Sequence, residues 1–400
     1  MKTILIHIAI RLGFVAIVFI GFNFIYQKEF YASDVQKYSR VKNRIDSAFH
    51  NGDIVYLGES SNTSYNPWTD TLKESISDFL QLYIPSQKVE AVTHESYHPG
   101  LFKQMLNLQP NIHLPWEFMA SHDDQTIILG VNIRTCGPTA VFSGNEASNQ
   151  QEALFYSKRP SLLTRLFLSL KYYDHRDALE MERLKFQWWR SVDISGKYLS
   201  NIGQDYYISN KYKTVKTWID ALASDQRPEL PVQVKNMADA YVKEFAFLLD
   251  DDNVRVQDLK EIVSICNKLS LRLIFHILPP NKQHANALFN HCELIQYLDY
   301  NYLFLKKRFS EWGVTVVDNY NLPEANEKVS RFTDQWYPTE HYDATIRKAI
   351  AKSLVSVIEG QNSRTLKEVF PTRNNEPNFN IKMPYSDSLI GVWKQVKWLK

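Results

Sequence analysis

Short apolar runs alternate with amphipathic stretches over two long parts of the chain. The apolar runs have the length and the continuous hydrophobicity that are typical of strands buried on both faces of a parallel sheet. They lie at residues 54–57, 88–93, 124–132, 271–278 and 314–319. Strands that alternate with helices predict an α/β fold with a doubly wound, parallel five-stranded sheet of the flavodoxin-like type.

Helical spacing of apolar residues follows each predicted strand. Asn66 is a candidate N-cap, and Pro67 suits the first helical position. The predicted helices are 68–83, 101–108, 256–269, 293–312 and 341–359. The sheet domain therefore spans residues 53–360, with its last helix opening at His341.

A different pattern fills residues 140–250, where no strand–helix alternation occurs. Helical runs near 151–157, 161–189 and 231–249 predict a helical insert in the sheet domain. The insert carries the pair Trp188-Trp189. Tryptophans of this kind either line a sugar-binding face or pack between helices, and the sequence leaves both interpretations open.

The N-terminus contains an apolar segment of about 20 residues, enough to cross a bilayer. Its core is Leu12–Tyr26, and Lys2 and Arg11 on its amino side indicate that this end stays in the cytoplasm. A cleaved signal peptide is the rival interpretation. Only Phe30-Tyr-Ala32 resembles a cleavage site. We therefore expect a transmembrane anchor at 1–27, a neck at 28–52 and an extracytoplasmic sheet domain.

The C-terminal tail, residues 361–400, is polar until its basic and aromatic end, residues 388–400. That end fits a late strand or an interfacial helix.

The composition argues against several kinds of partner and site. A net charge of +2 gives no reason to expect a nucleic-acid partner, and the three cysteines have no metal-ligand or redox spacing and allow at most one disulfide.

Polar residues with catalytic potential follow several strands. Ligands of open α/β sheets bind outside the carboxyl ends of the strands. Ser60 follows the first strand, Gly100 lies beyond the second, Asn132 ends the third, and His341 comes late in the chain. Acyl transfer needs a nucleophile, a nearby base and donors for the oxyanion, so these residue types fit one site.

The motifs Gly-Glu-Ser60, Gly100, Gly-x-Asn132 and a late His341 resemble the SGNH (GDSL-type) hydrolase superfamily. The resemblance covers residues 53–132 and 271–360. It implies that Ser60 is the nucleophile and His341 the general base. It also implies that the oxyanion hole is formed by the N–H groups of Ser60 and Gly100 and by the side chain of Asn132.

The chain departs from the family pattern at two positions. Glu59 stands where the family usually has Asp, and Pro338 stands where it has the acid that orients the histidine. We rank Asp334 first as the replacement, a backbone carbonyl of the Pro338 turn second, and Glu340 third. Arg134, two residues after Asn132, either holds an anionic substrate group or is paired structurally.

An anchored SGNH-like domain is similar to membrane-bound proteins that move acyl groups onto cell-envelope polymers. The resemblance implies a membrane-anchored, extracytoplasmic serine esterase or O-acyltransferase that acts on a cell-envelope polysaccharide. Its partners would be an acylated polysaccharide or acyl donor and a membrane-bound O-acyltransferase, and no metal or cofactor is implied. The alternative is a non-catalytic SGNH-like partner that binds glycan or docks on such an acyltransferase.

Overall fold

A parallel five-stranded sheet forms the centre of the protein. The structure is a computed structural model that describes residues 2–30, 40–63, 70, 72–108, 125–143, 175–196, 199–224, 232–288, 293–328, 331–333 and 338–360. The strands are β1 (Ile54–Gly58), β2 (Val89–Thr93), β3 (Thr126–Val131), β4 (Arg272–Ile277) and β5 (Thr315–Asp318). All neighbours are parallel, in the order β2-β1-β3-β4-β5. This is the flavodoxin-like order, so the predicted fold class is confirmed.

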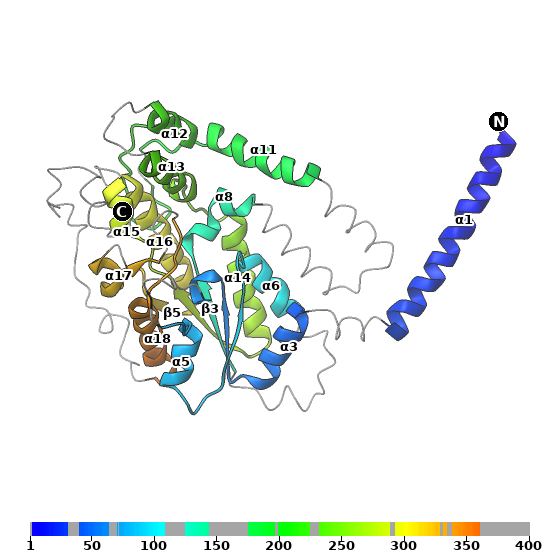
Figure 1. Cartoon of the computed structure of the whole chain (residues 1–400), viewed down its shortest axis with the longest axis horizontal. Helices are drawn as coiled ribbons and strands as arrows, with labels where there is room; N and C mark the ends of the chain where they lie inside the picture. Colours follow the sequence, from blue (N-terminus) through cyan, green and yellow to red (C-terminus); the bar gives the residue numbers. More distant parts are fainter. Residues whose placement is uncertain are drawn as a thin grey trace.

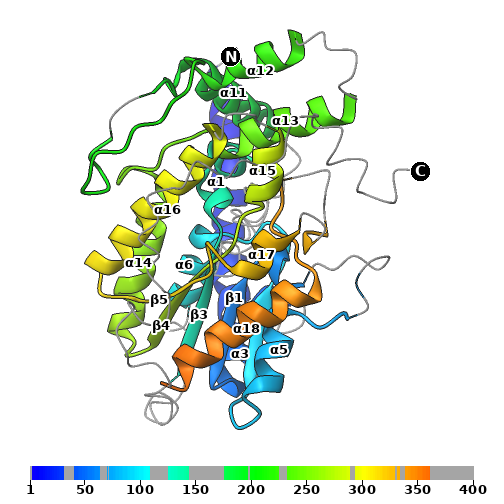
Figure 2. The same ribbon diagram turned by 90° about the vertical axis from the view of Figure 1, so that its left-hand side faces the viewer.

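Helices cover both faces of the sheet (Figures 1 and 2). One face carries α5 (Ile76–Tyr83), α17 (Pro323–Glu327) and α18 (Ala344–Ile358), which pack with sheet residues such as Tyr56 and Ile128. The opposite face carries α3 (Arg40–Asn51), α6 (Pro99–Leu108), α14 (Val254–Lys268) and α16 (Glu293–Glu311). Every residue of β1 and β3 is buried, because helices cover both faces, and this explains why their sequences are continuously apolar.

Helices also make up the described part of residues 140–250. They are α8 (Pro138–Val141), α11 (His175–Ser191), α12 (Val215–Ser224) and α13 (Val232–Phe245), and Figure 1 shows them at the top of the molecule. An isolated bridge between Asp193 and Thr214 is the extended pairing described there. The predicted run at 151–157 and the first half of the run at 161–189 lie outside the described residues. A short helix, α15 (Lys282–Leu288), then packs against α13 and α16.

Two predicted helix starts are wrong. The helix predicted at 68–83 is α5, and it begins at Ile76 rather than at residue 68. A capping box formed by Ser75 and Asp78 precedes it. The chain before it is held by buried Arg347, which forms an ion pair with Asp70 at 2.8 Å. Arg347 also donates to the carbonyls of Leu72 and Glu74 at 2.6 and 2.8 Å. These contacts use carbonyls that a helix would need.

The last helix also starts later than predicted. Asp343 caps α18 by accepting from the backbone N–H of Ile346 at 3.0 Å, and the helix begins at Ala344. His341 therefore precedes the helix instead of opening it. Asp343 is the better cap because its carboxylate reaches the exposed N–H groups of the first turn.

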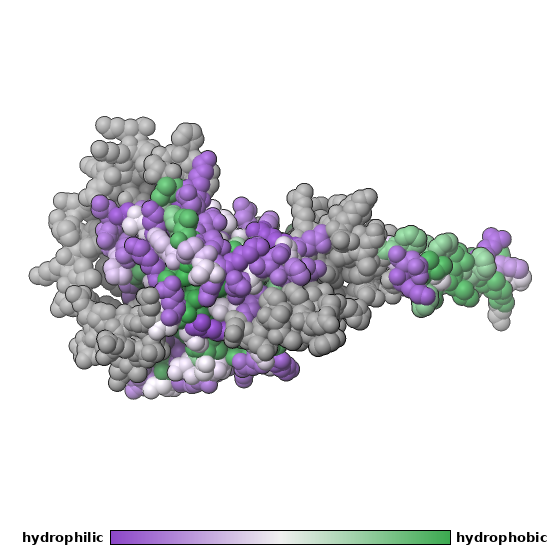
Figure 3. Space-filling view, turned by 90° about the horizontal axis from the view of Figure 1, so that it is seen from below, coloured by the Kyte–Doolittle hydropathy of each residue, from purple (hydrophilic) through white to green (hydrophobic). Residues whose placement is uncertain are grey.

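The N-terminal helix α1 (Lys2–Ile25) continues into the π-helical turn η1 (Tyr26–Phe30). It is long and apolar enough to span a membrane. Its large apolar side chains are exposed, and Figure 3 shows this helix largely in the hydrophobic colour at one end of the molecule. In the segment expected as a neck, α3 packs Ile45, Ala48 and Phe49 into the core beside the sheet.

Two of the three cysteines, Cys136 and Cys266, are buried and are not joined in a disulfide. Cys292 and the tail at 361–400 lie outside the described residues. The prediction for the tail therefore stays a prediction.

Candidate active site

Ser60 and His341 meet at the carboxyl edge of the sheet. Ser60 is the first residue of a one-turn helix, α4 (Ser60–Thr63), which follows β1 after the single residue Glu59. The Nε2 atom of His341 lies 3.0 Å from the Oγ atom of Ser60, although 281 positions separate them in the sequence. Both residues are half-buried. A hydroxyl within hydrogen-bond reach of an imidazole nitrogen is the arrangement of a nucleophile and its general base.

His341 is held by a short antiparallel pairing that sequence periodicity does not show. The N–H of Thr333 donates to the carbonyl of His341 at 2.8 Å, and the N–H of Asp343 donates to the carbonyl of Arg331 at 2.7 Å. The Arg331 guanidinium also pairs with the Asp343 carboxylate at 2.9 Å. The backbone from His341 to Asp343 is therefore held in place, and this restricts the positions that the His341 ring can take.

Asn132 lies between two carboxylates. It directly follows β3 and caps the 3₁₀ turn η3 (Ile133–Cys136), and its Oδ1 accepts from the N–H of Arg134 at 2.9 Å. Its Nδ2 donates to Glu59 Oε1 at 2.5 Å and to Glu340 Oε2 at 2.6 Å. Asn132 has a 3 % exposed surface, Glu59 4 % and Glu340 3 %. The side-chain amide thus makes strong charge-assisted bonds in an environment closed to water.

Arg134 is the cation of this buried cluster. Its Nε donates to Glu340 Oε2 at 3.1 Å, and its Nη1 lies 4.0 Å from Glu244 Oε2 on α13. Burial alone would lower the pKa of Arg134, but the carboxylates of Glu340, Glu244 and Glu59 raise it above its usual range. Of the two interpretations of Arg134, structural pairing is the one that these contacts support.

Glu59 is a buried carboxyl of the cluster, and its pKa is raised. Burial raises its pKa to about 7. The Arg134 guanidinium opposes that rise, the Glu340 carboxylate adds to it, and hydrogen bonds from Asn132 and Ser61 lower it again. Near neutral pH this carboxyl is therefore partly protonated, because burial disfavours its charged form more than the Arg134 guanidinium favours it.

Gly100 lies in the first turn of α6, against α14. A Cβ atom at this position would lie 2.5 Å from Arg255 Nη1 and 2.7 Å from Asp258 Oδ2, and these two side chains form a buried ion pair. Close packing of α6 on α14 is therefore a sufficient reason for a glycine here. Its backbone N–H as an oxyanion donor stays a prediction.

Gly100→Ala is expected to lower the free energy of unfolding by about 1–3 kcal/mol, because the added methyl group displaces the Arg255–Asp258 pair. Gly130→Ala is the matched control, since its Cβ would have no neighbour nearer than 3.7 Å. Thermal unfolding of both variants measures the difference. Equal melting temperatures for Gly100→Ala and the wild type would contradict the packing argument.

Asp334, the first-ranked partner of His341, lies outside the described residues. Glu340 is described, and its carboxylate is bound to Asn132 and Arg134. The neighbouring side chains of Glu340 and His341 thus serve different partners. The assignment of Asp334 stays a prediction.

Other histidine and tryptophan side chains that could have served a site are packed in or against the core. His276 on β4 is fully buried, and burial lowers its pKa to about 3, with the Tyr56 hydroxyl 3.4 Å from its Nδ1. Trp188 and Trp189 pack against the core, and Trp189 also lies between the ammonium groups of Lys185 and Lys243. Packing between helices is therefore the interpretation of this tryptophan pair that the structure supports.

The sequence did not show that Glu59 accepts a hydrogen bond from Asn132. It suggested Glu340 as a partner of His341, whereas Glu340 also accepts from Asn132. The signal was present, since each is an acidic residue directly before a candidate catalytic residue. Their common partner was not visible, because Asn132 and Glu340 are 208 positions apart. Glu244, which approaches from the insert, gave no local signal.

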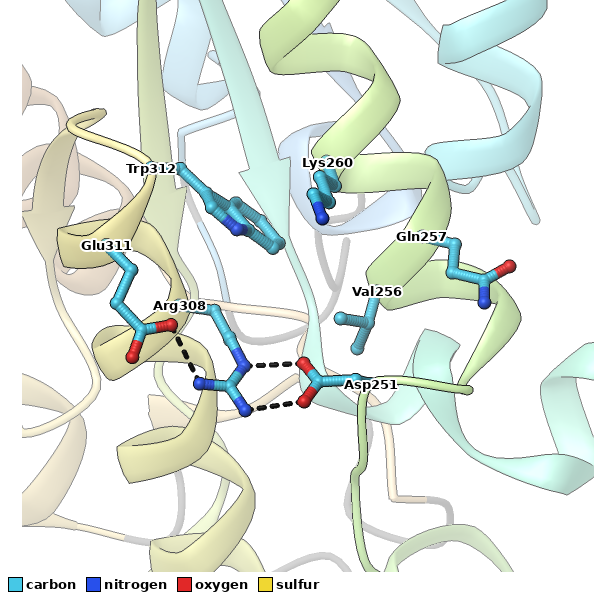
Figure 4. A pocket seen from close by; sticks show the side chains of 7 residues that line it. All are labelled: Asp251, Val256, Gln257, Lys260, Arg308, Glu311 and Trp312. Atoms are coloured by element: carbon cyan, nitrogen blue, oxygen red, sulfur yellow. Dashed lines mark hydrogen bonds and ion pairs between the residues drawn. The ribbon is translucent and has the colours of Figure 1, made fainter. Parts of the chain in front are cut away.

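A hollow with a volume of about 410 Å³ lies between α14 and α16, away from the candidate site (Figure 4). Its lining residues are Asp251, Val256, Gln257, Lys260, Arg308, Glu311 and Trp312. The Arg308 guanidinium binds Asp251 with two bonds of 2.5 and 2.6 Å and Glu311 with one of 2.7 Å. Because its charges already compensate one another and it contains neither Ser60 nor His341, this hollow is not the candidate site.

Metal ligation has no support in the described part of the chain, where no three His, Cys, Asp or Glu side chains are grouped as metal ligands.

No protein-family model matches the chain, and no curated protein was found to be similar to it. Among solved structures, the chain is similar to the lipase/acylhydrolase from Enterococcus faecalis, with a TM-score of 0.32 and 8 % sequence identity. The match covers 77 % of this chain and 95 % of the other.

Proposed function

We propose that the protein is a membrane-anchored, extracytoplasmic serine esterase or O-acyltransferase that acts on acyl groups of a cell-envelope polysaccharide. The proposal of serine catalysis is supported by the 3.0 Å contact between Ser60 Oγ and His341 Nε2 at the carboxyl edge of the sheet. An edge of this kind is where α/β proteins bind ligands. The helix α1 supports the anchor, since it is long and apolar enough to span a membrane.

In the proposed reaction Ser60 attacks the carbonyl carbon of an acyl ester while His341 takes the hydroxyl proton. The new Oγ–C bond gives a tetrahedral intermediate whose oxygen carries the negative charge. The first N–H groups of a helix have no partner within it, so the N–H of Ser60 at the start of α4 is suited to bind this oxygen. Collapse breaks the bond to the alcohol, which leaves with the proton from His341.

The acyl group then passes from Ser60 to water or to a sugar hydroxyl. His341 removes a proton from the acceptor, the acceptor oxygen bonds to the acyl carbon, and the Ser60 Oγ–C bond breaks as the proton returns to Ser60. The same two residues serve hydrolysis and transfer, and only the acceptor differs. The helices of residues 140–250 stand beside this edge in Figure 1, which places them suitably to select the acceptor.

The test uses the full chain in detergent micelles with p-nitrophenyl acetate, and then with an O-acetylated polysaccharide. The proposal predicts p-nitrophenol release, labelling by a fluorophosphonate probe, and acetate release or acetyl transfer with the polymer. Polymer binding without labelling or turnover would contradict it and favour the non-catalytic glycan-binding alternative.

A further inference from the structure

The Asn132 side chain has no hydrogen left for a substrate. A side-chain amide carries two N–H donors and one carbonyl oxygen. Nδ2 donates to Glu59 at 2.5 Å and to Glu340 at 2.6 Å, and Oδ1 accepts from the N–H of Arg134. To reach a substrate oxyanion, the amide would have to give up its hydrogen bond to one of two buried carboxylates, and such a loss is costly.

The two carboxylates belong to the residues that precede the nucleophile and the base. Glu59 directly precedes Ser60 in the sequence, and Glu340 directly precedes His341. One amide therefore joins two segments from opposite ends of the sheet domain at the place where Ser60 Oγ and His341 Nε2 are 3.0 Å apart. Arg134 adds a second tie, because its Nε binds the same Glu340 oxygen at 3.1 Å.

Arg134 also faces a carboxylate of the insert. Its guanidinium reaches Glu244, which is buried on α13, at 4.0 Å. The cluster of Glu59, Asn132, Arg134, Glu244 and Glu340 thus connects β1, β3, α13 and the His341 turn. We call these five residues the clamp.

We propose that Asn132 and Glu340 are positioning residues, which hold Ser60 and His341 in contact through the clamp, and that Asn132 is not an oxyanion donor. This inference rests on the proposed serine chemistry for its catalytic consequence. A displacement of about 1 Å at a reacting pair can cost about 100-fold in rate. Breaking the clamp therefore lowers the rate without removing any group that touches the substrate.

The experiment is a double-mutant cycle with Asn132→Ala, Glu340→Ala and the double variant, measured in the full chain in micelles. The readout is the rate of labelling by a fluorophosphonate. If both residues act through the clamp, each single variant labels about 100-fold more slowly, and the double variant is no slower than the worse single variant. Glu340→Gln keeps an acceptor oxygen for Asn132 and Arg134, so it should restore most of the rate.

An oxyanion donor gives a different result. Loss of such a donor costs about 10²–10³-fold by itself, and its loss would multiply with any effect of Glu340→Ala. A labelling rate in the double variant equal to the product of the two single effects would overturn the inference. So would a normal rate in Glu340→Ala.

A second readout does not depend on activity. The His341 ring is titrated by NMR in ¹⁵N-histidine-labelled protein, with His341→Gln for assignment. We expect Asn132→Ala and Glu340→Ala each to move its titration midpoint away from the wild-type value, because each frees the ring from its position beside Ser60, with no further shift in the double variant. An unchanged midpoint in both single variants would overturn the inference. If the variants show these shifts but the wild type neither labels nor hydrolyses esters, the proposed function fails and the clamp stands.

Asn301→Ala is the control for simple loss of stability. Asn301 is also a buried amide, which accepts from the N–H of Leu249 at 2.8 Å and donates to the carbonyl of Phe247 at 2.9 Å, away from Ser60. It should lower the melting temperature while leaving the labelling rate of the folded protein and the His341 titration unchanged. Slower labelling of this variant, matching that of Asn132→Ala, would overturn a specific role for the clamp.

Discussion

Ser60→Ala is expected to reduce ester turnover by about 10⁴-fold or more and to abolish fluorophosphonate labelling, because no other group takes the place of a lost nucleophile. The substitution removes one half-buried hydroxyl at the start of α4. Since the hydrogen bond of that hydroxyl is made with His341 at the edge of the sheet, the melting temperature should change little. Initial rates with p-nitrophenyl acetate, corrected for folded protein, measure the effect.

Ser61→Ala is the matched control, because Ser61 is the next residue of the same helix. Its side chain is buried and bonds to Glu59 rather than to His341. This variant should keep its labelling and most of its turnover. Labelling that survives in Ser60→Ala and disappears in Ser61→Ala would show that the wrong serine has been assigned.

Asp334→Asn is expected to lower turnover by about 10⁴-fold, as removal of the carboxylate does in the serine-protease triad. A histidine base needs its second nitrogen held so that the first one faces the serine. Glu340 is already bound to Asn132 and Arg134, so Glu340→Gln should cost little. Turnover of the two variants at several pH values measures the difference.

The opposite results have distinct meanings. Near-normal turnover in Asp334→Asn would favour a backbone carbonyl of the Pro338 turn as the partner of His341. A large loss in Glu340→Gln alone, with a shifted pH profile, would mean that Glu340 orients the base and would reverse the ranking.

The sheet was predictable because its sequence signal is local. Strands such as β1 and β3 are buried throughout and therefore read as unbroken apolar runs. Their parallel order brings the carboxyl ends together, so Ser60 and Asn132 were expected at one edge. His341 was placed there by its late position and by family resemblance, and its 3.0 Å contact with Ser60 agrees with that placement.

Long-range contacts explain what sequence reasoning did not find. The late start of α5 depends on Arg347, which binds Asp70 from the far end of the domain. The clamp depends on Glu340, which approaches Asn132 from 208 positions away. An asparagine after a strand suggests a donor to the substrate, and only the fold shows that both its hydrogens are used by carboxylates.

The most direct test of the account is to locate the fluorophosphonate adduct. The wild-type full chain is treated with the probe, digested and examined by tandem mass spectrometry, with heat-denatured protein as the control for non-specific reaction. The account predicts one stoichiometric adduct on Ser60, which is absent after denaturation and absent in His341→Gln. An adduct on any other residue, or no adduct on folded protein, would contradict the claim that Ser60 and His341 form a catalytic pair.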